Sequence, residues 1–155
     1  THWFFIFSPS KIIKFTEIQS DKRHGSLRTP MCCTGKRLLI VEDDYNTLIG
    51  LQELLGHKGY HVKGATCAAK AIHLTENESI DIVLCDYRLP DMDGNHLCRK
   101  LKQINTHLVI FIFTAYNQPE LVDLVNESIV DEVFNKPLQL EDLYRALEMY
   151  RTCQG

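Results

Sequence analysis

Polar side chains follow four apolar stretches of the chain that have the composition of buried β-strands. These side chains are Glu42, Asp43, Asp86, Thr114 and Lys136. In an open parallel sheet the carboxyl ends of the strands meet at one edge, and ligands bind in the crevice outside that edge. We therefore expect these five side chains to gather in one cleft.

The three carboxylates of this set would repel one another, and each would raise the pKa of its neighbours unless a cation intervened. A hard divalent ion with oxygen ligands relieves the repulsion, and Mg²⁺ is the ion we expect, bound by carboxylates together with a substrate phosphate. A carboxylate can also act as a nucleophile and form an aspartyl phosphate. The Lys136 ammonium and the Thr114 hydroxyl would then contact the phosphoryl oxygens.

Each of these residues has a structural explanation when it is considered alone. An acid that follows a strand is often only the N-cap of the next helix, and a Thr or Lys at a strand end is commonly structural or solvated. The functional prediction therefore depends on the set. Asp44 falls outside the acidic pair, and we expect it to cap a helix.

The elements that must position these residues alternate regularly along the chain. Apolar stretches of strand type cover residues 37–41, 60–65, 80–85, 108–113 and 131–135. Amphipathic stretches of helical type cover residues 46–57, 67–77, 94–103, 119–128 and a final segment from about 140. Apolar strands that alternate with amphipathic helices favour a parallel sheet covered on both faces. We predict a small doubly wound α/β domain.

Composition and charge limit the remaining possibilities. The chain has 155 residues, of which 45% are hydrophobic and 24% charged, as in an ordinary globular protein. No apolar run approaches the roughly 20 residues that span a bilayer. The net charge of −3 gives no reason to expect nucleic-acid binding. We predict no contact with nucleic acid or with a membrane.

The charge also suggests how the chain is divided. Residues 1–37 contain seven Lys/Arg and two Asp/Glu, whereas residues 38–155 contain ten and eighteen. We expect a basic, non-essential extension over 1–35 that is flexible or non-native, a domain over 36–150 and a short tail over 151–155. The alternative for the extension is a linker or signalling segment from an upstream domain. Met31 is a candidate for the natural start.

The six cysteines show neither a CxxC pair nor a zinc-site spacing with histidine. They are Cys32, Cys33, Cys67, Cys85, Cys98 and Cys153. We expect reduced thiols in a reducing, cytoplasmic compartment.

Four motifs make a family resemblance visible at this point. They are LLIVEDD (38–44), IVLCDYRLPDMDG (82–94), VIFIFTA (109–115) and FNKP (134–137). Over residues 36–150 the chain resembles the receiver domain of bacterial two-component response regulators, the CheY-like superfamily. The resemblance implies a flavodoxin-like, five-stranded sheet in the order 2-1-3-4-5. It also implies a phosphohistidine donor on a sensor histidine kinase or a phosphotransfer protein.

The resemblance further implies a role for each site residue. Asp86 would be the phosphoacceptor. Mg²⁺ would be bound directly by Asp43 and Asp86, through water by Glu42, and by the backbone carbonyl of Arg88. Thr114 would be the switch hydroxyl and Lys136 the phosphate-binding lysine, followed by a cis Lys136–Pro137 peptide bond. The domain would accept and lose a phosphoryl group without being a turnover enzyme.

Two departures from the family pattern affect signalling. The family usually has an aromatic residue three positions before the lysine, where this chain has Val133, and Phe134 should point to the opposite face of the strand. The small Gly-Ala pair before the fifth strand is replaced by Ser128-Ile-Val130. We therefore expect signalling to run through the 114–119 loop and the helix after it.

Any homodimer would form on the face made by the fourth helix, the fifth strand and the fifth helix. The apolar residues that suggest this face are Leu121, Val122, Leu124 and Val125. Their packing in the core is the alternative explanation.

Two other functions compete with this interpretation. One is a degenerate receiver that binds proteins without taking phosphate. The other is a dehalogenase-like phosphatase, because Asp91-Met-Asp93-Gly94 matches a DxDG signature. That signature should follow a strand directly, however, and Arg88-Leu-Pro90 intervenes. We expect Asp93 to cap the following helix instead.

Overall fold

The computed structural model describes residues 35–115 and 118–152. Residues 1–34 of the predicted extension over 1–35 lie outside the described residues, and so do residues 153–155 of the predicted tail. Met31 and three of the six cysteines, Cys32, Cys33 and Cys153, are among them.

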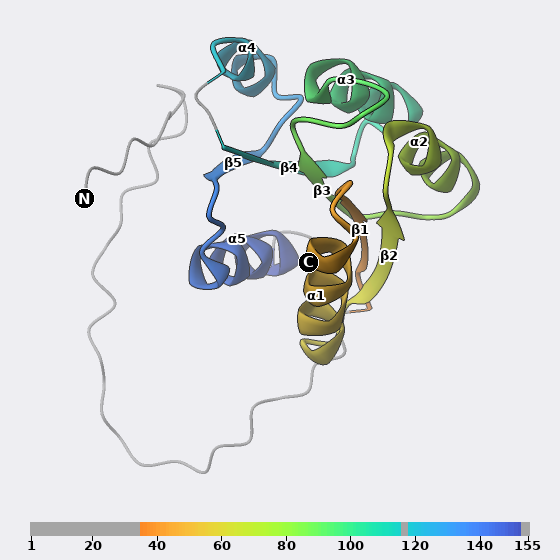
Figure 1. The fold of residues 1–155 in the computed structure, drawn as a ribbon, viewed down its shortest axis with the longest axis vertical. Coiled ribbons are helices and arrows are strands. Elements are labelled where there is room, and N and C mark those ends of the chain that lie inside the picture. The colour runs from red at the N-terminus through yellow and green to blue at the C-terminus, as the bar shows by residue number, and fades with distance from the viewer. Residues whose placement is uncertain (1–34, 116–117, 153–155) are drawn as a thin grey trace.

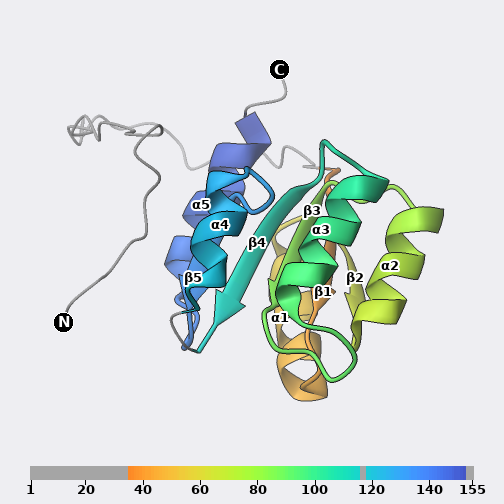
Figure 2. The same cartoon turned by 90° about the horizontal axis from the view of Figure 1, so that it is seen from above.

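Strands and helices alternate through the described chain. They are β1 (Arg37–Val41), α1 (Tyr45–His57), β2 (His61–Ala65), α2 (Ala68–Asn77), β3 (Ile82–Asp86), α3 (Gly94–Ile104), β4 (Val109–Thr114), α4 (Glu120–Asn126), β5 (Glu132–Asn135) and α5 (Leu140–Thr152) (Figure 1). The strands form one parallel sheet in the order β2-β1-β3-β4-β5 (Figure 2). The predicted fold class, strand order and number of elements are confirmed, and the predicted boundaries lie within two residues of those observed.

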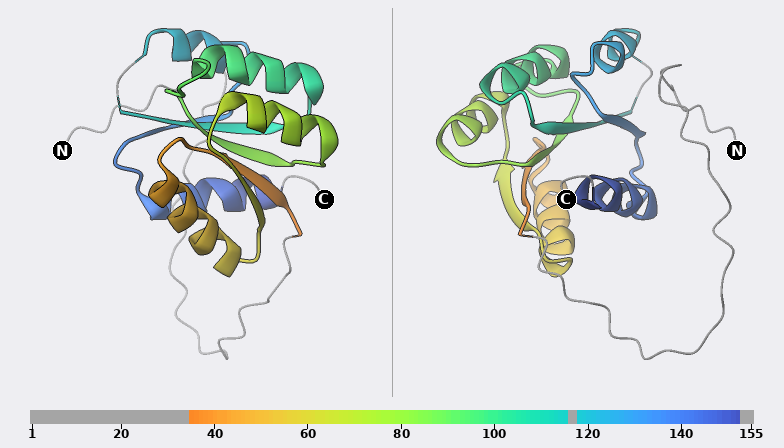
Figure 3. Two further views of the ribbon diagram at one scale, coloured as in Figure 1. Left: turned by 45° about the vertical axis from the view of Figure 1, so that its right-hand side comes forward. Right: turned by 180° about the vertical axis from the view of Figure 1, so that it is seen from behind.

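Helices cover both faces of the sheet, as Figures 1 and 3 show. Helices α2, α3 and α4 pack on one face, where Leu39 and Val41 of β1 point. Helices α1 and α5 pack on the other face, which receives Leu38 and Ile40. Because successive side chains of a strand point to opposite faces, a strand between two helical layers must be apolar throughout. This explains the continuous apolar runs in the sequence.

Burial differs among the apolar residues of α1 and α4. Leu54 of α1 is 40% exposed, while Leu48, Leu51 and Leu55 of the same helix are buried. In α4, Leu121 and Leu124 are buried in the core and Val125 packs against it. Core packing thus accounts for the apolar character of these α4 residues, in agreement with the alternative to a dimer face.

The register brings the strand ends to a common edge. Val41 pairs with Cys85, Asp86 with Phe113, and Thr114 with Asn135. Residues at or just after these four strand ends therefore lie side by side along one edge of the sheet. None of the helices in residues 35–115 and 118–152 combines the length and the apolar character that a bilayer crossing demands.

Helices α1 and α4 end in the same hydrogen-bonded motif with different residues at its left-handed position. After α1, Gly59 (φ 90°) donates to Gly56 O and Tyr60 donates to Leu55 O. After α4, Ser128 (φ 58°) donates to Val125 O and Ile129 donates to Leu124 O. These pairs define a Schellman motif, in which glycine is the usual left-handed residue. Ser128 therefore holds a conformation that disfavours a Cβ atom, and it ends α4 two residues before the predicted boundary.

The substitution Ser128→Gly should raise the free energy of unfolding by about 0.5 to 1 kcal/mol, because glycine adopts a positive φ without steric cost. The matched change Gly59→Ala, at the same position of the α1 motif, should lower it by about the same amount. Urea denaturation followed by circular dichroism measures both. A Ser128→Gly variant less stable than the parent chain would show that the serine side chain stabilises the turn.

Candidate functional site

The side chains predicted to carry chemistry do gather at one edge of the sheet. Glu42 and Asp43 follow β1 directly, and Asp86 and Thr114 are the last residues of β3 and β4. Lys136 follows β5, and its backbone N–H donates to Thr114 O at 2.8 Å. Because β1, β3, β4 and β5 are consecutive neighbours in the sheet, each strand delivers one part of a single site.

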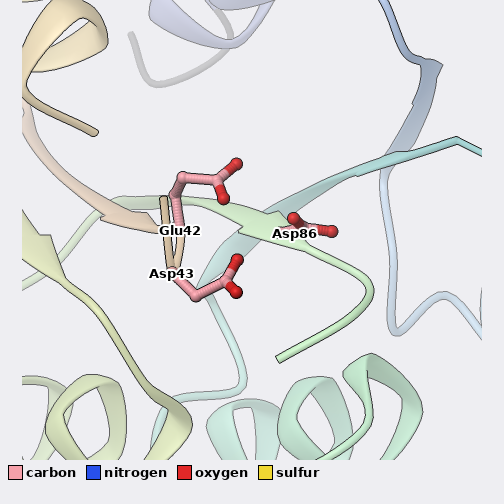
Figure 4. Close-up of side chains that lie close together, drawn as sticks. All are labelled: Glu42, Asp43 and Asp86. Atoms are coloured by element: carbon pink, nitrogen blue, oxygen red, sulfur yellow. The ribbon is translucent and has the colours of Figure 1, made fainter. Parts of the chain in front are cut away.

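Three of these residues form a compact acidic cluster. One carboxylate oxygen from each of Glu42, Asp43 and Asp86 lies within 4.8 Å of the other two. Figure 4 shows the carboxyl groups of Glu42 and Asp43 extending from the end of β1 on the side where Asp86 ends β3. Glu42 and Asp86 are only 2% and 7% exposed, whereas Asp43 is open to solvent. The sequence prediction of an acidic cluster is confirmed.

Burial and repulsion both act on Glu42. Burial raises the pKa of the Glu42 carboxyl, and the nearby charge of Asp86 raises it further. The Asp44 backbone N–H, which donates to Glu42 Oε1 at 3.0 Å, and the Lys136 ammonium oppose this rise. The pKa of Glu42 is therefore raised mainly because the side chain is buried, and the charge of Asp86 adds to that rise.

Lys136 brings a positive charge directly to the cluster. Its Nζ donates to Asp86 Oδ2 at 2.7 Å and to Glu42 Oε2 at 3.4 Å. Burial disfavours the ammonium, but the hydrogen bond to Asp86 and the charges of Asp86 and Glu42 outweigh it and raise the pKa of Lys136. The lysine is therefore charged at neutral pH. The Lys136–Pro137 peptide bond is cis, as the family resemblance implies.

Asp86 is held on both of its oxygens. Oδ2 accepts from Lys136, and Oδ1 accepts from the Arg88 backbone N–H at 3.0 Å. A carboxylate has about four acceptor sites, and these contacts use two of them. The group is thus fixed in orientation and retains lone pairs for a metal or an electrophile.

Two other aspartates of the sequence motifs cap helices. Asp44 Oδ1 accepts from Thr47 N at 2.7 Å at the start of α1. Asp93 Oδ1 accepts from His96 N at 2.9 Å at the start of α3. The predicted capping roles of Asp44 and Asp93 are confirmed. Asp93 therefore has a structural role in the DxDG segment.

Val133 stands where the family pattern has an aromatic residue, and it packs on the opposite face of β5 from Phe134, as the sequence predicts. Val133 packs against the core beneath α2, α3 and α4. Phe134 packs against the opposite core, with its ring 5.7 Å from the Phe111 ring. Within the described residues, β5 therefore presents a valine on the face where the family pattern has an aromatic ring.

Two features of the site region were missed by sequence reasoning. Asp91 accepts hydrogen bonds from the first residues of α2. A pocket of about 400 Å³ lies beside the acidic cluster, lined by Glu42, Thr47, Leu51, Phe113, Lys136, Pro137, Leu138 and Leu140. In the sequence, the signal for this pocket is the pair of apolar residues Leu138 and Leu140, which follow Lys136-Pro137.

Comparisons with known proteins agree with this geometry. A family profile described as "Response regulator receiver domain" matches residues 38–148. The chain is 38% identical over 104 residues to a cyclic di-GMP phosphodiesterase of Thermotoga maritima, which is 67% of this chain and 28% of that protein. It is 29% identical over 115 residues to sporulation initiation phosphotransferase F of Bacillus subtilis, which is 74% of this chain and 93% of that protein.

The match to the Thermotoga maritima protein thus spans little more than a quarter of that relative's length. A crystal structure of a CheY-like response regulator receiver domain protein from Methanospirillum hungatei superposes with a TM-score of 0.72 at 29% identity, covering 76% of this chain and 94% of that one. The profile match over most of the described residues, together with the sheet order and the acidic cluster, shows that this chain belongs to the response regulator receiver domain family.

Proposed function

We propose that Asp86 accepts a phosphoryl group from a phosphohistidine, with Mg²⁺ bound at the acidic cluster. The observation that carries this proposal is the Asp86 carboxylate, which is oriented by Arg88 and Lys136 and flanked by Glu42 and Asp43. The Bacillus subtilis relative is named a phosphotransferase, which supports transfer of a phosphoryl group.

The donor set fits Mg²⁺. Three carboxylates offer oxygen atoms within 4.8 Å of one another, and magnesium prefers such hard ligands. Asp43 and Asp86 would hold the ion directly, Glu42 would hold it through water, and the backbone carbonyl of Arg88 would be a further ligand. When bound, the ion neutralises charge on the transferring phosphoryl group.

The chain's own residues then account for the transfer. A carboxylate oxygen of Asp86 forms a bond to phosphorus while the P–N bond of the donor breaks, and its electron pair returns to the imidazole ring. Lys136, already charged and within reach of Asp86, stabilises the negative phosphoryl oxygens. The Thr114 hydroxyl, at the end of the neighbouring strand, donates to one of them and reports that the group has arrived.

The partner is a sensor histidine kinase or a histidine phosphotransfer protein. The domain acts as an acceptor that later loses its phosphoryl group, without turnover as an enzyme. The Thermotoga maritima protein is named a phosphodiesterase, but the match covers only 28% of its length. We therefore propose no phosphodiesterase activity for this domain. The three described cysteines are unpaired, which supports the reducing, cytoplasmic location that we propose.

The limits of the domain, 36–150, and a homodimer on the face of α4, β5 and α5 remain predictions. With Leu121 and Leu124 in the core, the dimer would have to use other residues of that face. We also propose that this domain binds neither nucleic acid nor membrane.

Phosphorylation should occur on Asp86 alone. After treatment with acetyl phosphate and Mg²⁺, intact mass spectrometry should show one phosphoryl adduct on the parent chain and none on Asp86→Asn. The control Asp93→Asn changes a helix cap and should still be phosphorylated. An adduct that persists in Asp86→Asn refutes the assignment. A parent chain that takes no phosphate contradicts the proposed function and favours the degenerate receiver.

The two adjacent aspartates after β1 should behave differently toward the metal. Asp43→Ala should weaken Mg²⁺ binding by more than about tenfold. Mutating a group that only hydrogen-bonds to a metal ligand already costs about tenfold or more in metal affinity. Asp44→Ala removes a helix cap but keeps the backbone N–H that donates to Glu42, so its affinity should stay within about twofold of the parent value. An amide NMR titration with Mg²⁺ measures both. The reverse order of effects would show that Asp44 is the ligand.

The structural response to phosphate should lie mainly in residues 114–125. Val133 offers no ring that could move when Thr114 shifts, so the change should pass to the 114–119 loop and α4. Amide hydrogen exchange compared with and without beryllofluoride and Mg²⁺ should show altered protection in peptides from 114–125. Changes confined to β5 would mean that the usual switch operates by another route.

A further inference from the structure

Helix α2 begins without a cap of its own. Its N-cap residue, Cys67, has an extended backbone and makes no side-chain hydrogen bond to the helix. The backbone N–H groups of Ala68 and Ala69 donate instead to Asp91 Oδ1 and Oδ2, each at 2.9 Å. A negative carboxylate is favourable at this end of a helix, where the first N–H groups have no intrahelical acceptor. Asp91 therefore caps α2 from another part of the chain.

Asp91 belongs to the loop over 87–93, which connects the phosphoacceptor to α3. Gly94 N–H donates to Tyr87 O at 2.8 Å, and Arg88 pairs with Asp93 across the loop. A Cβ atom at Gly94 would lie 2.8 Å from Tyr87 Cδ2 and 2.9 Å from Tyr87 Cα. The glycine thus permits a close contact that folds the loop into one compact unit.

This unit bears directly on the reactive carboxylate. The Arg88 N–H, near the start of the loop, donates to Asp86 Oδ1 at 3.0 Å. Leu89 and Met92 pack against the core and hold the loop by apolar contacts, which have little directional preference. The two hydrogen bonds of Asp91 are directional, and they fix the loop to the first turn of α2.

We propose that Asp91 is a positioning residue of the phosphoacceptor site. By fastening the 87–93 loop to α2, it holds Arg88 where its N–H orients Asp86 and its carbonyl can contact the metal. The inference rests on the proposed function, because it concerns the same Mg²⁺ site. It adds a residue whose contacts are with α2, outside the acidic cluster itself.

Mutations can separate the two effects of Asp91, which are the capping of α2 and the link between α2 and the 87–93 loop. Cys67 already has the extended backbone of an N-cap residue (φ −154°, ψ 163°), and serine at such a position accepts from the first N–H groups of its own helix. The double variant Cys67→Ser/Asp91→Ala should therefore restore the cap of α2 without restoring the link to the loop. Asp91→Asn keeps an acceptor oxygen but removes the charge.

The experiment is an amide NMR titration of the full chain with Mg²⁺, combined with thermal melting of each variant. Asp91→Ala should weaken Mg²⁺ affinity by about three- to tenfold, below the tenfold or greater effect of groups that contact a ligand directly. The double variant should regain the melting temperature of the parent chain but keep the weakened affinity. The Mg²⁺ affinity of Asp91→Asn should stay within about twofold of the parent value, because the hydrogen-bonded link to α2 needs an acceptor oxygen more than a charge.

Three results would overturn the inference. Parent-like affinity in Asp91→Ala, or affinity restored by Cys67→Ser, would make Asp91 only a cap for α2. An Asp91→Asn variant as weak as Asp91→Ala would show that the one acceptor oxygen that asparagine keeps does not hold the loop, contrary to the expected hydrogen-bonded link. A parent chain that neither binds Mg²⁺ nor takes phosphate on Asp86 would instead refute the proposed function, and this inference with it.

Discussion

Repulsion among three carboxylates at one sheet edge is the constraint on which the site depends. Two of them, Glu42 and Asp86, are buried, where water screens their charges little. Lys136 reaches both, and backbone N–H groups of Asp44 and Arg88 donate to them. The pKa of Glu42 nevertheless remains raised, first because the side chain is buried and then because of the nearby charge of Asp86. A cluster of three carboxylates in contact with the Lys136 ammonium is suited to bind a further cation.

The parallel sheet makes this concentration of charge tolerable. Two apolar layers, one under α2, α3 and α4 and the other under α1 and α5, fix the strands in a single register. Slipping a strand by one residue would move each of its side chains to the other face. The cores therefore determine which atoms meet at the edge.

The connection between the site and the rest of the domain departs from the family pattern in two places. Val133 occupies the face of β5 where an aromatic ring is usual, and Phe134 packs on Phe111 on the other side. Ser128, which holds a left-handed backbone, begins the Ser128-Ile-Val130 segment that replaces the Gly-Ala pair of the family pattern. Val133 lies in β5 and Ser128 lies just after α4, so neither residue belongs to the acidic cluster.

The sequence by itself determined the strand and helix pattern, the acidic cluster, the lysine and the capping roles of Asp44 and Asp93. Each follows from local periodicity or from position at a strand end, and parallel strand ends have to meet. Tertiary structure alone decided that Asp91 caps α2, that Leu54 is exposed and that a pocket lies beside Lys136. Asp91 and Ala68 are 23 residues apart, and no local pattern encodes a hydrogen bond across that separation. Such contacts depend on how the loops pack once the sheet has formed.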